Sequence, residues 1–86
     1  MNQLYYFKLK NCPYCVRANN YLDELLLEDR YKSIQIRHID ERAESDLANS
    51  YDYYLVPSFF LGEQKLFEGI MTKEDVRSVL EEVLKK

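Results

Sequence analysis

The stretch NCPYCVRANNYLDELL, residues 11–26, decides the fold, because it contains both cysteines of the chain and begins a predicted helix. Pro13 suits the first helical turn, since a proline lacks the backbone N–H that would have no partner there. Apolar residues then recur at helical spacing, and the pattern fades near Asp29: Ala18, Leu22, Leu25 and Leu26. Cys12 is therefore expected at the helix N-terminus, with Cys15 one turn further along the same face.

Apolar patterns and turn residues on both sides of this stretch predict the other elements. Strands are expected at residues 4–9, 34–39, 57–61 and 64–67, a modest helix of two or three turns within residues 40–54, and a last helix from the capping box at Thr72 to about Leu84. The order βαβαββα predicts an α/β fold with a four-stranded mixed sheet flanked by helices, because a strand–helix–strand crossover gives a parallel pair and a tight turn gives an antiparallel hairpin. With 86 residues the chain has room for one domain, residues 1–86.

The composition limits the classes of function. The net charge is −3, and Lys and Arg are scattered among Asp and Glu, so we expect no nucleic-acid partner. No apolar run approaches the roughly 20 residues that span a bilayer, so we expect no membrane association. Residues 1–9 show no secretory signal. A cytoplasmic monomer is therefore the expectation.

A pair of cysteines three residues apart is open to several interpretations. A structural disulfide would close a loop of only four residues, which gives less entropic benefit than a long crosslink, and a cytosolic setting would keep it reduced. A structural zinc site needs four ligands, whereas the chain offers two cysteines and His38. A copper-chaperone site can use two cysteines, but such chaperones usually have the order βαββαβ.

The expected helix N-terminus favours redox chemistry. Free backbone N–H groups and the helix dipole stabilise the thiolate of Cys12, and Lys8 and Lys10 place positive charge nearby. Cys15 should be less exposed and keep a higher pKa. We therefore expect Cys12 to be the nucleophile that attacks an external disulfide, and Cys15 to be the thiol that resolves the mixed disulfide.

The chain resembles the dithiol glutaredoxins of the thioredoxin-like superfamily over nearly its whole length. The resemblance rests on CPYC at residues 12–15 after a first strand, on VPSFF at residues 56–60, and on the order of elements. It implies a glutaredoxin fold and a thiol–disulfide oxidoreductase that reduces protein or glutathione mixed disulfides, with glutathione as a cosubstrate and no bound cofactor or metal. It also implies that the Val56–Pro57 peptide is cis and faces the cysteines, and that the backbone of Val56 pairs with glutathione or a client peptide.

Three further residues complete the expected substrate site. Gly69 is what remains here of the Gly-Gly pair with which glutaredoxins usually bind the γ-glutamyl end of glutathione. Tyr14, between the cysteines, is expected to be exposed and to touch substrate. Lys10 is expected to support the thiolate electrostatically at the edge of this site.

The chain also departs from the glutaredoxin pattern. Leu55 stands where a threonine is usual, and Leu9 where a lysine is frequent. Residues 67–76, FEGIMTKEDV, resemble the corresponding stretch of thioredoxins more closely, and Glu68 would place negative charge where a glutathione carboxylate binds. A thioredoxin-like redoxin reduced by a flavoprotein reductase is therefore an alternative. A metal or iron–sulfur carrier is a third interpretation.

Overall fold

The computed structural model describes residues 3–85. The elements follow in the order β1 (Leu4–Lys8), α1 (Pro13–Leu26), β2 (Ile36–Asp40), α2 (Ser45–Asn49), β3 (Ser58–Leu61), β4 (Gln64–Glu68) and α3 (Lys73–Lys85). The predicted order βαβαββα and the predicted mixed sheet of four strands are confirmed. In this described part of the chain, no helix is both long enough and apolar enough to cross a membrane.

The four strands lie in the order β2-β1-β3-β4. β1 pairs with β2 in parallel through the crossover helix α1, and the pairs β1–β3 and β3–β4 are antiparallel. Ser58, the first residue of β3, lies in register with Phe7 of β1 and with Glu68 of β4. The segments that leave β1 and β4 therefore meet the segment that enters β3 at one end of the sheet.

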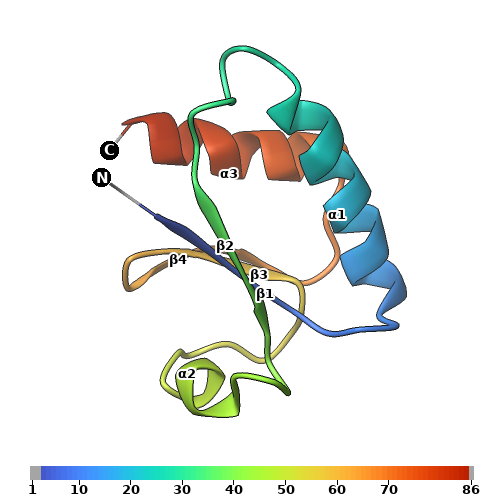
Figure 1. The fold of residues 1–86 in the computed structure, drawn as a ribbon, viewed down its shortest axis with the longest axis vertical. Coiled ribbons are helices and arrows are strands. Elements are labelled where there is room, and N and C mark those ends of the chain that lie inside the picture. Colours follow the sequence, from blue (N-terminus) through green and yellow to red (C-terminus); the bar gives the residue numbers. More distant parts are fainter. Residues whose placement is uncertain (1–2, 86) are drawn as a thin grey trace.

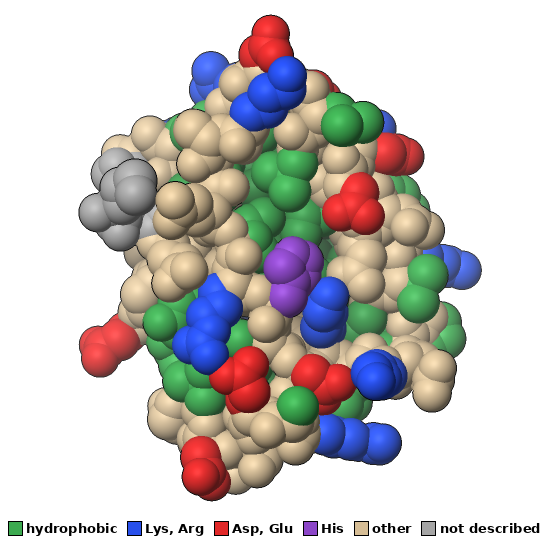
Figure 2. All heavy atoms as spheres, viewed as in Figure 1, with side chains coloured by type: hydrophobic (Ala, Val, Ile, Leu, Met, Phe, Trp, Pro, Cys, Tyr) green, Lys and Arg blue, Asp and Glu red, His purple; other side chains and the backbone are tan. Residues whose placement is uncertain are grey.

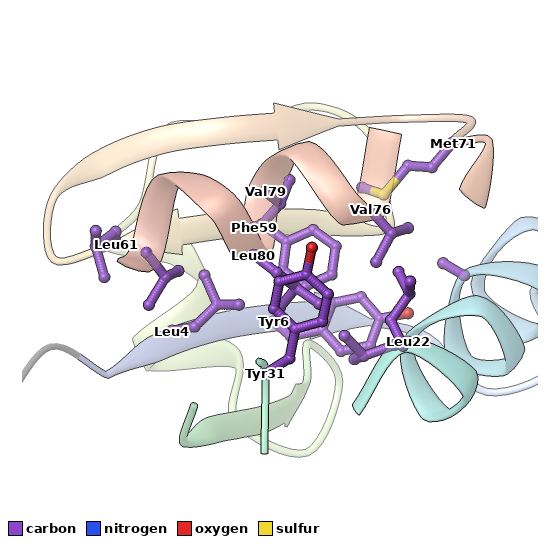
Figure 3. Packing of buried hydrophobic residues seen from close by; sticks show 13 residues of the cluster. Leu4, Tyr6, Leu22, Tyr31, Phe59, Leu61, Met71, Val76, Val79 and Leu80 are labelled. Carbon is purple, nitrogen blue, oxygen red and sulfur yellow. The ribbon is translucent and has the colours of Figure 1, made fainter. Parts of the chain in front are cut away.

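Helices cover both faces of this sheet. α1 and α3 pack against each other on one face, and α2 lies on the other (Figure 1). Successive strand residues point to opposite faces, so β1 contributes Tyr6 to the core under α1 and α3 and Phe7 to the core under α2. Figure 3 shows the first core, in which the ring of Tyr6 stacks on that of Phe59 with centroids 4.5 Å apart. The sheet end is thus held between two apolar layers.

Helix α2 is shorter than predicted, with five residues rather than two or three turns. The carboxylate of Asp40 accepts hydrogen bonds from the backbone N–H groups two and three residues further on, at 2.9 and 3.3 Å, a local turn that competes with a helix. After α2, the rings of Tyr51 and Tyr53 pack on Phe7 with centroid distances of 4.9 and 5.0 Å. This packing draws the chain across the sheet instead of continuing the helix.

Candidate active site

Cys12 lies directly before the first helical residue of α1, at the helix N-terminus, as predicted. It is the N-cap, with φ −92° and ψ 114°, and Pro13 follows in the first turn. The Cys12 Sγ accepts a hydrogen bond from the backbone N–H of Cys15 at 3.3 Å. Asn11, at φ 61°, adopts the left-handed conformation that asparagine tolerates and turns the chain into the helix. A helix leaves its first N–H groups without intrahelical partners, and one of them, the N–H of Cys15, is the donor to this sulfur.

The two thiols lie in different environments. Both are free, but Cys12 is partly exposed, whereas Cys15 is buried with 1% of its surface accessible. Burial raises the pKa of the Cys15 thiol to about 12, and its hydrogen bond with Cys12 adds to this, while the backbone N–H of Leu9 and the charge of Lys8 lower it. Cys15 therefore stays protonated at neutral pH, next to a sulfur that solvent can reach.

Tyr6 connects the sheet to this first turn of α1. Its side chain is fully buried, and its hydroxyl donates a hydrogen bond to the backbone carbonyl of Cys15 at 3.4 Å. Burial raises the pKa of Tyr6, and the charges of Cys15 and Cys12 raise it further. The phenol therefore remains a hydrogen-bond donor at neutral pH and fixes the position of the buried cysteine.

The Val56–Pro57 peptide is cis, as the resemblance implied. Pro57 is buried and Val56 partly exposed, and the carbonyl of Pro57 accepts a hydrogen bond from the N–H of Gly69 at 2.8 Å. Gly69 has φ +94°, a conformation that favours glycine, and a Cβ added there would lie 3.3 Å from Cδ1 of Leu55. The cis-proline segment and Gly69 thus form one unit at the end of the sheet.

The carboxylate of Glu68 is turned toward the same unit. It accepts hydrogen bonds from the backbone N–H groups of Tyr54 at 2.9 Å and Leu55 at 3.0 Å, and from Lys65 Nζ at 2.6 Å. The hydrogen bond from Lys65, followed by those from the two N–H groups, lowers the pKa of Glu68 to about 2. The negative charge expected near a glutathione carboxylate is therefore paired, and it holds the segment that precedes the cis-proline.

The other two predicted site residues lie beside the cysteines. Tyr14 is in the first turn of α1 and is 44% exposed, as predicted. Lys10 is exposed and lines a cavity of about 360 Å³ together with Cys15. The fold thus brings Cys12, Pro57 and Gly69 to one end of the sheet and places Lys10 on the side of the second cysteine.

The same cavity contains a contact that sequence reasoning missed, although Lys8 itself was expected to place positive charge near Cys12. Lys8 and His38 both line it, and Lys8 Nζ lies 3.0 Å from His38 Nδ1 and 5.5 Å from the centre of the Tyr6 ring. His38 is exposed at the surface, but partial desolvation of its ring and then the charge of Lys8 lower the pKa of the imidazole, whereas Asp23 raises it. The neutral imidazole therefore accepts a hydrogen bond from the Lys8 ammonium. Figure 2 shows the histidine near the centre of this face, with basic side chains beside it.

Two further observations concern possible ligands. Within residues 3–85, no group of three or more His, Cys, Asp or Glu side chains is placed to hold a metal ion. A separate concavity of about 620 Å³ lies beside α2 and is lined in part by Tyr51, Tyr53 and Tyr54. It contains no residue of the predicted site.

Comparisons with known proteins identify the family and the fold. The family model described as Glutaredoxin matches residues 4–66. Similar solved structures include a malarial protein with 18% identity and a TM-score of 0.73, which covers 95% of this chain and 96% of that chain. An uncharacterised thioredoxin-like protein from Clostridium perfringens is 29% identical, with a TM-score of 0.67 over 95% of this chain and 70% of that chain.

Oxidised glutaredoxin 2 from Chlamydomonas reinhardtii is 22% identical, with a TM-score of 0.52 over 98% of this chain and 80% of that chain. At this identity, and at that of the malarial protein, the likeness shows the fold alone. No curated protein sequence matches the chain significantly.

Proposed function

The chain belongs to the glutaredoxin family and is in general terms a thiol–disulfide oxidoreductase, and we propose that it reduces protein or glutathione mixed disulfides through Cys12 and Cys15, with glutathione as the electron donor. The observation that carries this proposal is the difference between the two sulfurs. One is accessible and caps a helix, and the other is buried one turn away with a raised pKa. A dithiol reductase needs this combination of a reactive thiolate and a protonated reserve thiol.

The reaction balances as two exchanges of sulfur–sulfur bonds. The Cys12 thiolate attacks a disulfide R–S–S–R′, forms a bond to the first sulfur, and releases R′–S⁻, which takes a proton from solvent. Cys15 then loses its proton to solvent and attacks Cys12 Sγ. The Cys12–Cys15 disulfide forms, R–S⁻ leaves, and two electrons have passed to the substrate.

Reduced glutathione would restore the dithiol by the reverse sequence. A first molecule forms a mixed disulfide with Cys12 and frees Cys15, and a second molecule releases oxidised glutathione. We assign the backbone of Val56 to pairing with the substrate, and Pro57 and Gly69 to the shape of its groove. Tyr14 and Lys10 would contact the substrate beside the cysteines.

A second candidate is a thioredoxin-like redoxin that a flavoprotein reductase reduces. The segment after β4 supports it, because it offers one glycine rather than two, and the exposed Ile70 follows directly after Gly69. An apolar side chain at this place suits a polypeptide better than the charged end of glutathione. Turnover with glutathione and glutathione reductase, compared with turnover with thioredoxin reductase, separates the two donors.

The roles of the cysteines are tested with serine substitutions in a disulfide-exchange assay. Cys12→Ser should abolish exchange. Cys15→Ser should accumulate mixed disulfides and keep activity toward glutathionylated substrates. Parental activity in Cys12→Ser would refute the assignment.

We further propose that the protein acts as a cytoplasmic monomer, a setting in which free thiols persist. Purification with stoichiometric metal and negligible reductase activity would instead support a metal or iron–sulfur carrier.

A further inference from the structure

We propose that Lys8 serves the second half of the reaction, in which its ammonium group stabilises the developing thiolate of Cys15 as that sulfur attacks Cys12. This inference rests on the proposed function and deepens it. It concerns a lysine outside the CPYC motif. Because Lys8 acts through Cys15 rather than on the substrate, it is a positioning residue.

Strand β1 directs Lys8 toward the buried cysteine. Residues two apart on a strand share a face, so Lys8 lies on the same face of β1 as Tyr6, the side that α1 covers. The hydroxyl of Tyr6 already bonds to the carbonyl of Cys15. Lys8 and Cys15 both line the cavity of about 360 Å³ between β1, β2 and α1. The ammonium group and the second thiol therefore share one local environment.

The Lys8 side chain is held in this position by two contacts. Nδ1 of His38 accepts its hydrogen bond at 3.0 Å, and the ring of Tyr6 lies under its charge at 5.5 Å. In parallel pairing, His38 on β2 is the register partner of Tyr6 on β1, which places the imidazole on the same face. An oriented cation loses less side-chain entropy when a negative charge forms beside it.

None of the other titratable groups around the cavity is as well suited as Lys8 to stabilise a thiolate at Cys15. His38 is neutral, since partial desolvation of its ring and the lysine charge lower its pKa. Asp40 also lines the cavity, but its carboxylate accepts hydrogen bonds from two backbone N–H groups. Lys10 also lines the cavity but is exposed, whereas Lys8 is half-buried, so solvent screens the charge of Lys10 more strongly. Asp23, which lies on α1, carries a negative charge that raises the pKa of His38 and therefore acts against the effect of the Lys8 ammonium.

Resolution is the step at which a cation is most useful. Burial raises the pKa of Cys15 to about 12, so this thiol is almost entirely protonated at neutral pH. If loss of Lys8 raised the pKa of Cys15 by one, the ionised fraction would fall tenfold. The greater nucleophilicity of a more basic thiolate recovers about threefold. The net expectation is a resolution rate about threefold lower for each such increment.

Reaction with 5,5′-dithiobis(2-nitrobenzoate) separates the two steps. Attack by Cys12 releases the first coloured thiolate, and resolution by Cys15 releases the second, so a stopped-flow record of the parent shows two phases. Lys8→Met should slow the second phase, by about threefold for each increment of one in the pKa of Cys15. In the Cys15→Ser background, which reports attack alone, Lys8→Met should leave the rate within about twofold. Lys8→Arg should restore the second phase. Lys32→Met is the matched control, because it removes an exposed lysine between α1 and β2, and its second phase should run at the parental rate.

Each result decides the inference. An unchanged second phase in Lys8→Met overturns it, and so does an equal slowing of attack in the Cys15→Ser background, because Lys8 would then act on Cys12. A parent protein without any second release overturns the proposed dithiol function itself, which is a distinct failure. His38→Leu keeps the lysine but removes its hydrogen-bond acceptor, and it should slow the second phase by a smaller factor. A normal second phase in that variant would overturn the role of the pair.

Discussion

Replacing Gly69 with alanine tests whether the turn after β4 shapes the active-site segment. Gly69 adopts φ +94°, and its N–H bonds to the carbonyl of Pro57 at 2.8 Å. An alanine Cβ would lie 3.3 Å from Cδ1 of Leu55, so that side chain must move by a few tenths of an ångström. Leu55 directly precedes Val56, the residue expected to pair with substrate. The substitution should therefore disturb both stability and exchange.

The magnitude follows from the backbone conformation and the contact. A non-glycine residue in a sparsely populated region of φ/ψ space costs about 1–3 kcal/mol. For a domain of this size, about 1 kcal/mol lowers the melting temperature by roughly 4–8 °C. Gly69→Ala should therefore melt about 5–20 °C below the parent. Strain at Gly69 should also weaken the hydrogen bond of its N–H to the carbonyl of Pro57 and reduce exchange, roughly twofold to tenfold.

Gly62→Ala is the matched control, because Gly62 has φ +61° but nothing lies within 4 Å of its added Cβ. It should cost about 1 kcal/mol and leave exchange intact. The two variants are compared by thermal unfolding and by disulfide-exchange rate per folded molecule. Equal exchange rates for Gly69→Ala and Gly62→Ala would refute the idea that Gly69 shapes the substrate groove.

Further predictions concern the loop, the core and the buried thiol. Glu68→Gln should speed hydrogen exchange at the backbone amides of Tyr54 and Leu55, measured by NMR or mass spectrometry, because their charged acceptor is lost; unchanged protection would contradict the proposed contact. Phe7→Ala should lower the free energy of unfolding in urea by about 3–5 kcal/mol, since the ring is fully buried under α2. The reduced protein should lose stability as the pH rises from about 9 to 12, because the raised pKa of Cys15 keeps this thiol protonated in the folded state while the unfolded chain ionises. A Cys15→Ala variant should lose less stability over that range in parallel urea titrations, and identical slopes would argue against the raised pKa.

Local patterns were sufficient to predict the main architecture. Pro13 predicts a helix start, because a proline suits the first helical turn, where the structure has it. The cis peptide before Pro57 came from the resemblance alone, since most bonds of this kind are trans. The predicted length of α2 was wrong. The packing of Tyr51 on Phe7 favours the shorter helix, and it joins residues far apart in the chain that a local pattern does not reveal.

Contacts that depend on strand register could not be predicted from the sequence. Lys8 and His38 are 30 residues apart, and Glu68 meets amides 13 and 14 residues before it. Only the pairing of Tyr6 with His38, and of Ser58 with Glu68, brings these groups together. The sequence shows which side chains are charged, but the pairing of the strands determines which of them are in contact.

The sulfur that caps α1 links the start of this helix to the redox poise of the protein. A thiolate is a strong acceptor for the N–H of Cys15, whereas the same sulfur in a disulfide is a weak one. With an ionised Cys12, the cap therefore stabilises the reduced protein more than the oxidised one. Stabilising the reduced form makes a dithiol a stronger oxidant, so a variant with a weaker helix start should have a more negative reduction potential.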